Sequence, residues 1–301
     1  MQKGTLKADL LLITTALIWG FAFVAQRVGM EYVGPFTFNG VRFALGSLSL
    51  LPLIAVTRKK AKSADEERPP LEPRIVLGAS LLAGLVLFLG ASFQQMGIVY
   101  TTAGKAGFIT GMYVILVPII GSRWGQKTST GTWIGAVLAI IGLYLLSVTG
   151  DFSISKGDLL VLTSAFFWAG HVLLIGWLSP KTDSLVLAST QFAVCSVLSM
   201  MMAFGVETVV LDGIIRGAVP ILYGGLASVG IAYTLQVVAQ RTAHPAHASI
   251  ILTLEGAFAA IGGWFLLNEV LSMRSLVGCA LMLAGMLVSQ LAGYLFPERN
   301  S

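Results

Sequence analysis

A thirteen-residue pattern near the start of the chain returns in its second half with seven of its residues unchanged. The two copies, Lys7–Trp19 (KADLLLITTALIW) and Lys156–Trp168 (KGDLLVLTSAFFW), lie 149 positions apart. Glycines near the end of each half repeat too, because Gly135 and Gly142 are matched by Gly278 and Gly285 at a spacing of 143. Duplicated halves made of apolar segments are typical of membrane proteins built from two structural repeats. We therefore expect two similar units, residues 1–150 and residues 151–301.

The composition predicts that the bilayer is the solvent of this chain. Hydrophobic residues make up 56% of the 301 residues and charged residues only 11%, with a mean hydropathy of +0.85. Soluble proteins carry about 25% charged residues. In lipid the backbone must satisfy its own hydrogen bonds, and apolar stretches of about 20 residues favour helices over the shorter, alternating strands of a barrel. The expected fold class is an all-α polytopic membrane protein.

Ten segments are long and apolar enough to be expected as transmembrane helices. Five helices in each half is an odd number, so the second half enters the membrane from the opposite face and the two repeats are inverted. The linker at residues 57–74 carries three prolines and mixed charges, and we expect it to be a solvated loop. The ten segments are residues 9–27, 36–56, 75–99, 103–122, 131–149, 158–178, 184–206, 214–239, 246–268 and 275–295.

Basic residues predict the orientation. With both termini in the cytoplasm, 13 of the 19 Lys and Arg residues lie on the inside and only Arg27, Lys156, Arg216 and Arg274 on the outside. This bias follows the positive-inside rule, so we expect an inner-membrane protein with both termini cytoplasmic. The net charge of +5 sits at segment ends, which argues against nucleic acid as a partner. The first segment is expected to be a retained helix rather than a leader, because its copy lies mid-chain.

Charged residues at membrane depth are the first functional candidates, because each costs at least about 2.5–3.5 kcal/mol at the centre of a helix. Glu255 lies about ten residues into its segment and Lys105 near the start of another. Glu255 is interpreted either as a proton or substrate-ammonium site or as one partner of a structural ion pair with Lys105 or Arg42. Lys105 is either a counter-charge for an anionic group or an interfacial lysine, and Arg42 is expected to face the bundle or a headgroup.

Neutral polar and aromatic residues supply further candidates for a binding site. Gln94 and Gln236 lie late in equivalent segments of the two halves, and amides in lipid need a partner from another helix or from a solute. Tyr113 and Tyr233 are expected to line the same space. Three mid-helix residues, Trp19, its repeat-equivalent Trp168 and the nearby His171, complete the set, although packing explains the tryptophans equally well.

Other polar residues are given structural interpretations. Asp9 and Asp158 start equivalent segments and are expected to cap helices. His244 and His247 flank Pro245, which favours a helix start over a metal site. The sequence has no phosphate loop, no His-Glu-x-x-His and no Gly-x-Ser-x-Gly, so we predict no catalytic residues, no cofactor, no metal and no enzyme activity.

Several stretches resemble one known family. They are Ala16–Phe23, Ala165–Trp168, Gly34-Pro35 before Arg42-Phe43, Ala106–Tyr113, Pro118, Leu252–Phe258 and Asn268-Glu269. Together they resemble the EamA family of the drug/metabolite transporter superfamily along almost the whole chain. The resemblance implies ten helices in two inverted five-helix repeats, with a central cavity lined by the third, fourth, eighth and ninth helices and contributions from the first and sixth. One departure is that family members often have Glu-Pro in the ninth helix, where this chain has Glu255-Gly256.

These observations predict a secondary transporter that exports small organic solutes such as amino acids, metabolites or drugs. It would work by alternating access around a midplane site, with a proton as one candidate coupling ion. An intramembrane enzyme and a non-transporting scaffold or channel are the alternatives. The sequence names neither the solute nor the direction of transport, the coupling ion or the oligomeric state.

Overall fold

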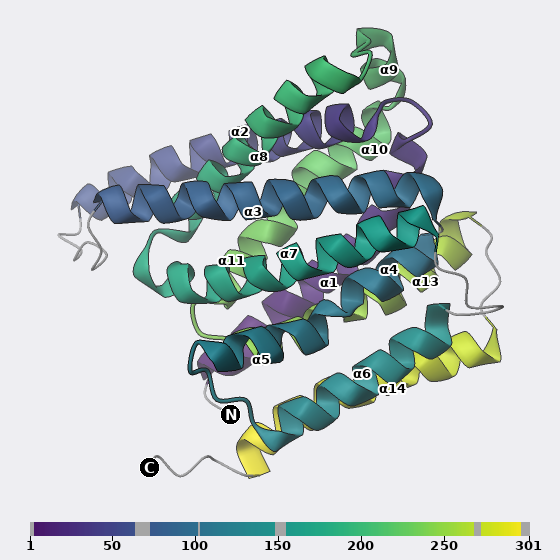
Figure 1. The fold of residues 1–301 in the computed structure, drawn as a ribbon. Helices are drawn as coiled ribbons and strands as arrows, with labels where there is room; N and C mark the ends of the chain where they lie inside the picture. The colour runs from purple at the N-terminus through teal and green to yellow at the C-terminus, as the bar shows by residue number, and fades with distance from the viewer. Residues whose placement is uncertain (1–2, 64–72, 102, 148–154, 268–271, 296–301) are drawn as a thin grey trace.

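Helices form all the regular structure in the described part of the chain (Figure 1). The computed structural model describes residues 3–63, 73–101, 103–147, 155–267 and 272–295. The helices are α1 (Lys3–Gly29), α2 (Pro35–Ser63), α3 (Pro73–Tyr100), α4 (Ala103–Gly111), α5 (Tyr113–Arg123), α6 (Thr130–Ser147), α7 (Lys156–Leu178), η1 (Ser179–Lys181), α8 (Ser184–Val206), α9 (Leu211–Arg216), α10 (Ala218–Leu222), the π-helical η2 (Tyr223–Tyr233), α11 (Thr234–Ala239), α12 (Pro245–Leu252), α13 (Leu254–Leu267) and α14 (Met273–Leu295).

Seven helical stretches of the described chain are long and apolar enough to cross a membrane. Three shorter apolar helices, Ile109–Arg123, Thr130–Leu145 and Met273–Ser289, fall in other predicted segments. Large apolar side chains such as Leu48 and Phe204 are exposed on the outside of the bundle, as lipid-facing positions require. The prediction of an all-helical polytopic protein is therefore confirmed at the level of helices and membrane spans.

One predicted boundary is wrong. The linker was expected to begin at residue 57, but α2 continues to Ser63. Lys59, Lys60, Ala61 and Lys62 are good helix formers, so no local signal ends the helix at the membrane surface. Residues 64–72, which hold the rest of the predicted loop, lie outside the described residues.

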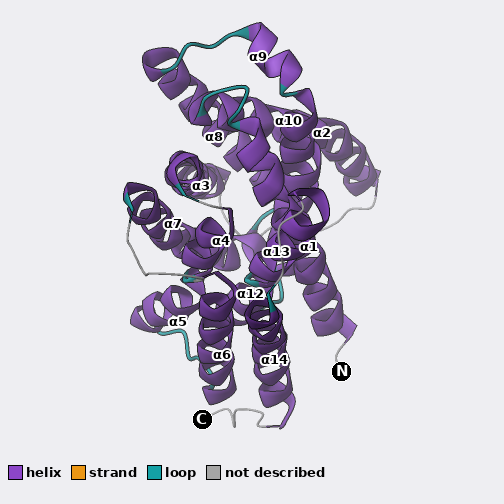
Figure 2. Cartoon of the chain, turned by 90° about the vertical axis from the view of Figure 1, so that its right-hand side faces the viewer, coloured by secondary structure: helices purple, strands orange, loops and turns teal. Residues whose placement is uncertain are grey.

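The main contacts between helices recur between the corresponding helices of the two halves. α2 packs against α8, and α6 packs against α14. The contact of α3 with α7 has its counterpart in α1 against η2 and α11, while α1 against α13 corresponds to α7 against α4 and α5. Figure 2, viewed toward the helix ends, shows α4, α12 and α13 surrounded by the other helices, with α6 and α14 side by side at one edge. Each half of the chain therefore contributes one side of every major contact.

Glycines bring α6 and α14 into close contact. A Cβ on Gly135 would lie 2.6 Å from the carbonyl oxygen of Gly285, and one on Gly142 would lie 2.5 Å from that of Gly278. The pairing is crossed, because the first glycine of one half meets the second glycine of the other. A crossed pairing of this kind is what two antiparallel copies of one helix produce.

Serines make an equivalent matched contact between α2 and α8. Ser47 donates from its hydroxyl to the carbonyl of Ser189 at 3.0 Å, and Ser196 donates to that of Gly40 at 2.8 Å. Both donors and both acceptors are related by the same 149-residue offset as the sequence repeat. The duplication is therefore visible in individual hydrogen bonds.

Two equivalent helices are interrupted near the middle of the bundle. α4 gives way to α5 at Met112, and α12 gives way to α13 at Thr253. Tightened turns mark both breaks, because the Met112 amide donates to Ile109 at 3.2 Å and the Gly256 amide to Thr253 at 3.0 Å. Continuous helices were expected over residues 103–122 and 246–268. The breaks carry no proline, and only the neighbouring Gly111 and Gly256 weaken the helix locally.

The predicted helix caps divide into one correct and one wrong assignment. Asp158 forms a capping box with Ser155 at the start of α7, as expected. Asp9 caps nothing, because α1 begins six residues earlier, at Lys3, and its carboxylate instead lies 3.0 Å from Nε2 of His247 on α12. His244 caps α12 with Pro245 at the first helical position, which confirms the predicted helix start.

Candidate functional site

The interrupted helices meet at a central cavity. About 40 Å³ is open to the centres of water molecules, and one water needs about 10–15 Å³, so the space holds a few waters. Side chains from both halves of the chain line it: Trp19, Phe23, Gln26, Arg42, Gln94, Thr110, Tyr113, Trp168, Val172, Ser228, Tyr233, Gln236, Leu252 and Glu255. These residues come from α1–α5, α7, η2 and α11–α13, so the cavity lies where the two halves meet.

Aromatic rings build one wall of this cavity. Tyr233 lies between the two repeat-equivalent tryptophans, with ring centroids 4.5 Å from Trp19 and 6.1 Å from Trp168. Trp168 donates from its indole nitrogen to Oε1 of Gln94 at 2.7 Å, and Trp19 donates to the carbonyl of Ser228 at 3.3 Å. Because both indole nitrogens have partners, the rings are held with their apolar surfaces available to a solute.

Glu255 brings a carboxyl group into the cavity, one residue after the helix break at Thr253–Leu254. It is 5% exposed and accepts a long hydrogen bond of 3.4 Å from the Tyr113 hydroxyl, which follows the equivalent break at Met112. Within the described residues no cation forms a salt bridge with Glu255. The ion pair with Arg42 that was weighed as an alternative is therefore absent.

Arg42 is the second ionisable group of the cavity. Its Nε donates to Oδ1 of Asn39 at 3.0 Å, and the guanidinium carbon lies 5.4 Å from the Phe38 ring centroid and 4.9 Å from that of Phe43. Cation–π contacts are worth about 0.5–2 kcal/mol each, against about 2.5–3.5 kcal/mol or more for a charge at the centre of a membrane helix. Together the two rings therefore offset a sizeable part of the cost of burying this charge, but they supply no counter-ion.

Neutral polar groups in the cavity also lack partners. Neither Oγ1 of Thr110 nor Oε1 of Gln236 has a hydrogen-bond partner in the described structure, although both atoms are buried. Buried polar groups without a partner cost about 1–3 kcal/mol each. The cavity therefore presents donors and acceptors that are available to water or a solute.

Seven of the nine predicted site residues line this cavity: Trp19, Gln94, Tyr113, Trp168, Tyr233, Gln236 and Glu255. His171 lies behind the wall, where it bonds Gln191 at 2.8 Å and meets the edges of Trp168 and Tyr233. The Lys105 side chain lies outside the described part, as does the Asn268-Glu269 pair. Whether these residues bind a solute remains a prediction.

Sequence reasoning missed several lining residues, above all Arg42, which was not placed in the site, and Gln26. Gln26 follows Trp19 by seven residues, two helical turns along the same face of α1, which was an available signal. The signal for Arg42 was its charge at membrane depth, which was weighed only as a possible ion pair with Glu255. Nothing in its spacing relates α2 to the helices that line the cavity.

Comparison with known proteins identifies the family of this chain. The profile of the EamA-like transporter family matches residues 6–148 and, a second time, residues 155–290. The chain belongs to the EamA-like transporter family. The resemblance drawn from the sequence motifs is thereby confirmed.

Relatives that match along almost the whole chain are also named as transporters. An uncharacterized transporter of Archaeoglobus fulgidus is 31% identical over 293 residues, which is 95% of this chain and 86% of the relative. The uncharacterized inner membrane transporter YedA of Escherichia coli K12 is 24% identical, covering 94% of this chain and 90% of its own length. A solved crystal structure shares the fold, with a TM-score of 0.74 over 98% of this chain and 99% of that one at 18% identity.

These comparisons establish the general function of the chain, which is transport. This EamA-like chain is a multi-pass membrane transporter, and both its family and its relatives are named for transport rather than for an enzyme. Transport implies the bilayer and a small solute as its partners.

Proposed function

We propose that the protein is a secondary carrier that exports small organic solutes by alternating access around the central cavity. One observation carries this proposal. Polar and charged groups, which membrane helices otherwise avoid, converge from both halves of the chain on the central cavity, and among the described residues neither charged group has a counter-ion. A scaffold would gain nothing from the unpartnered buried oxygens of Thr110 and Gln236. Nor would it gain from Arg42 and Glu255 buried without a salt bridge among the described residues.

The proposed architecture is ten transmembrane helices in two inverted repeats, residues 1–150 and 151–301. Support comes from the crossed glycine contact of α6 with α14, the matched serine bonds between α2 and α8, and the double match to the family profile. In this scheme the three shorter apolar helices also cross the membrane.

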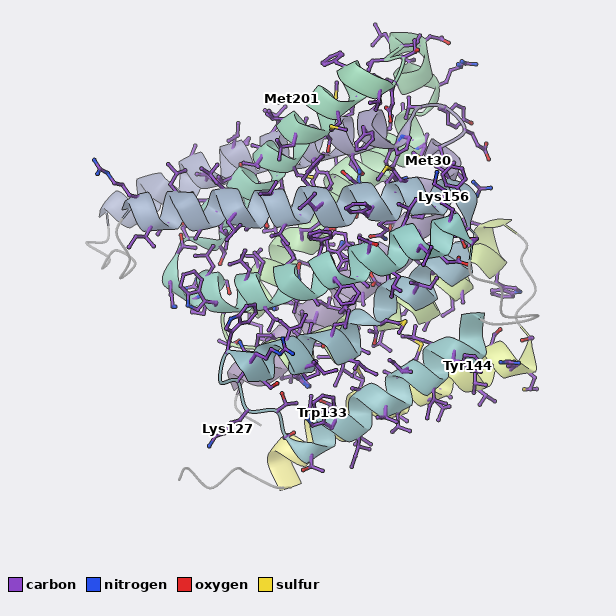
Figure 3. The ribbon with its side chains drawn as sticks, in the orientation of Figure 1. Met30, Lys127, Trp133, Tyr144, Lys156 and Met201 are labelled. Atoms are coloured by element: carbon purple, nitrogen blue, oxygen red, sulfur yellow. The ribbon has the colours of Figure 1, made fainter. Side chains whose placement is uncertain are left out.

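We further propose that both termini are cytoplasmic. The start of α1 and the end of α14 lie at the same end of the bundle (Figure 1). Lys127, counted on the inside, and Lys156, counted on the outside, lie at opposite ends of the molecule (Figure 3). This arrangement is consistent with the excess of basic residues on the inside.

Hydrogen bonds at the two ends of the bundle are candidates for gates. At the end where α1 starts, Asp9 binds His247, which joins α1 to α12. At the other end the Thr101 hydroxyl donates to Oδ1 of Asp158 at 2.7 Å, which joins the segment after α3 to α7. The two aspartates are repeat-equivalent. In this mechanism one gate opens while the other stays closed, and the small cavity widens to admit solute.

Counterflow in proteoliposomes tests the proposed function. Growth protection against a panel of amino acids, metabolites and toxic compounds, with and without expression, first selects a solute. A carrier accumulates labelled solute transiently against a large internal pool of unlabelled solute, and its rate saturates. Flux that does not saturate and shows no counterflow would indicate a channel, and absence of any protein-dependent flux would contradict transport of that solute.

A further inference from the structure

Arg42 is the most deeply buried cation in the described part of the chain. It is 3% exposed, and it lies seven residues into α2, about 10 Å along the helix from Pro35. Within the described residues no carboxylate forms a salt bridge with it. The charge is nevertheless retained in the lining of the cavity.

The surroundings of Arg42 hold the guanidinium without neutralising it. Asn39, itself buried, accepts from Nε and donates from its own amide to the carbonyl of Ala91 on α3 at 3.1 Å. Phe38 and Phe43 contact the cation through their rings. With Nε occupied, the two terminal Nη groups have no hydrogen-bond partner among the described residues. A fixed guanidinium with both Nη groups available matches the paired oxygens of a carboxylate.

We propose that Arg42 is an anion-binding subsite of the cavity, and that the solute carries a carboxylate or a similar planar anionic group that binds there. This inference rests on the proposed carrier function, because it assumes that a solute enters the cavity.

The other walls suggest how such a solute is oriented. Trp19, Tyr233 and Trp168 offer apolar ring surface for the body of the molecule. Glu255 and Arg42 line the same cavity but are not paired with each other, so each remains available to a different part of the solute. An anionic group placed at Glu255 would meet another carboxyl group and no cation among the described side chains, which favours Arg42 as the place of the anionic end.

Three probes of nearly the same shape but different charge test this assignment: phenylacetate, phenylacetamide and 2-phenylethylamine. Radiolabelled phenylacetate is bound to the purified full chain in detergent and displaced by each unlabelled probe. We expect phenylacetate to compete at about a tenfold lower concentration than the amide, because the amide lacks the charge that Arg42 pairs with. The amine should compete more weakly than phenylacetate as well.

Variants assign the preference to Arg42. Arg42→Gln should abolish the difference between phenylacetate and phenylacetamide, whereas Arg42→Lys keeps the charge and should retain a weaker preference for the anion. Arg27→Gln removes an exposed arginine at the end of α1, outside the cavity lining, and should leave displacement unchanged. Because Arg42→Lys preserves the buried charge, it also controls for misfolding of the glutamine variant.

Three results would overturn the subsite: no displaceable binding of phenylacetate, equal competition by anion and amide, or an undiminished anion preference in Arg42→Gln. These results are separable from failure of the carrier function. Saturable counterflow of a neutral or cationic solute by a protein without anion preference would reject Arg42 as the subsite and leave the carrier intact.

Discussion

Charged side chains, which are costly to place within a membrane, are buried at a few positions of this protein. Glu255 and Arg42 both line the cavity, and neither forms an ion pair within the described structure. An unpaired buried charge is strongly destabilising, whereas a purely structural role would be filled at least as well by apolar residues of similar size. At the residue scale the site is therefore recognisable by buried charged groups that have no counter-ion among the described residues.

Replacing Glu255 tests whether its carboxyl group carries the coupling proton. Glu255→Gln keeps the shape and the contact with Tyr113 but cannot release a proton, so transport driven by a pH gradient should fall to the level of protein-free vesicles. Solute exchange without net proton movement should persist, and the pH dependence of transport should disappear. Flux measured in reconstituted vesicles between about pH 4 and pH 9, a range that begins near the ordinary pKa of a glutamate side chain, decides this. An unchanged pH dependence would reject Glu255 as the proton site.

The types of site residue were predictable from the sequence, but their partners were not. Glu255, Gln94 and Gln236 were found because polar residues are rare at membrane depth. Arg42 was left outside the site, because only the packing of α2 against η2 brings it to the cavity. Asp9 was predicted to start the first helix, but α1 begins six residues earlier, at Lys3. Helix ends in an apolar chain leave only weak signals in the sequence.

At the element scale, glycines set the distance between α6 and α14. Gly142→Ala would put a Cβ 2.5 Å from the Gly278 carbonyl oxygen, and backbone on the facing helix cannot move aside easily. We expect a loss of stability of about 1–3 kcal/mol, the usual effect of overpacking. Gly78→Ala on α3 is the matched control, because nothing lies within 4 Å of its added Cβ. Thermal unfolding in detergent should show a lower midpoint for Gly142→Ala only; equal midpoints would contradict the close contact.

Glu207 caps α2 from a distant part of the chain. Its carboxylate follows α8 and accepts from the amides of Phe36 and Thr37 at 2.8 Å each and from the Thr37 hydroxyl at 2.7 Å. Glu207→Ala should lower stability by about 1–3 kcal/mol, because it removes a charged cap from a helix start. Asp212→Ala, which breaks a solvent-exposed pair with Arg216, should have little effect on the same thermal unfolding curve. Similar losses in both variants would show that the cap contributes nothing specific.

The positions of the helices along the chain were well predicted, but the breaks and the π-helical stretch within them were not. Long apolar runs fix where helices lie, since lipid permits no other structure for them. The breaks at Met112 and Thr253 and the π-helical stretch Tyr223–Tyr233 depend on packing around the cavity and not on a local breaker such as proline. Interrupted and π-helical segments frequently mark functional sites, and here both carry cavity residues.

At the scale of the whole molecule, the helix count determines where the chain ends. In the proposed architecture, ten spans place both termini on the same side of the membrane, and the excess of basic residues assigns that side to the cytoplasm. Reporter fusions that are active on only one side of the membrane should therefore give cytoplasmic signals at both the N-terminus and the C-terminus. Signals from opposite sides would mean an odd number of spans, and the inverted-repeat architecture would be wrong.

The two proposed gates, Asp9–His247 and Thr101–Asp158, should control from which side the cavity is reached. His247→Ala removes the bond to Asp9 and should favour opening toward the cytoplasm, whereas Thr101→Val removes the bond to Asp158 and should favour opening toward the other side. These opposite shifts are read out as the labelling rate of a cavity cysteine from each side. Shifts in the same direction would show that the two bonds are not gates at opposite ends.

Labelling of a single cysteine in the cavity tests alternating access itself. Ser228→Cys places a thiol in the cavity lining of a chain whose Cys195 and Cys279 have been replaced by alanine, and Ser199→Cys serves as a buried control outside the lining. A membrane-impermeant thiol reagent should label Ser228→Cys both in spheroplasts and in inverted vesicles, more slowly when solute is present, and should label Ser199→Cys in neither. Labelling of Ser228→Cys from one side only, or from neither, would contradict a cavity that opens alternately to the two sides of the membrane.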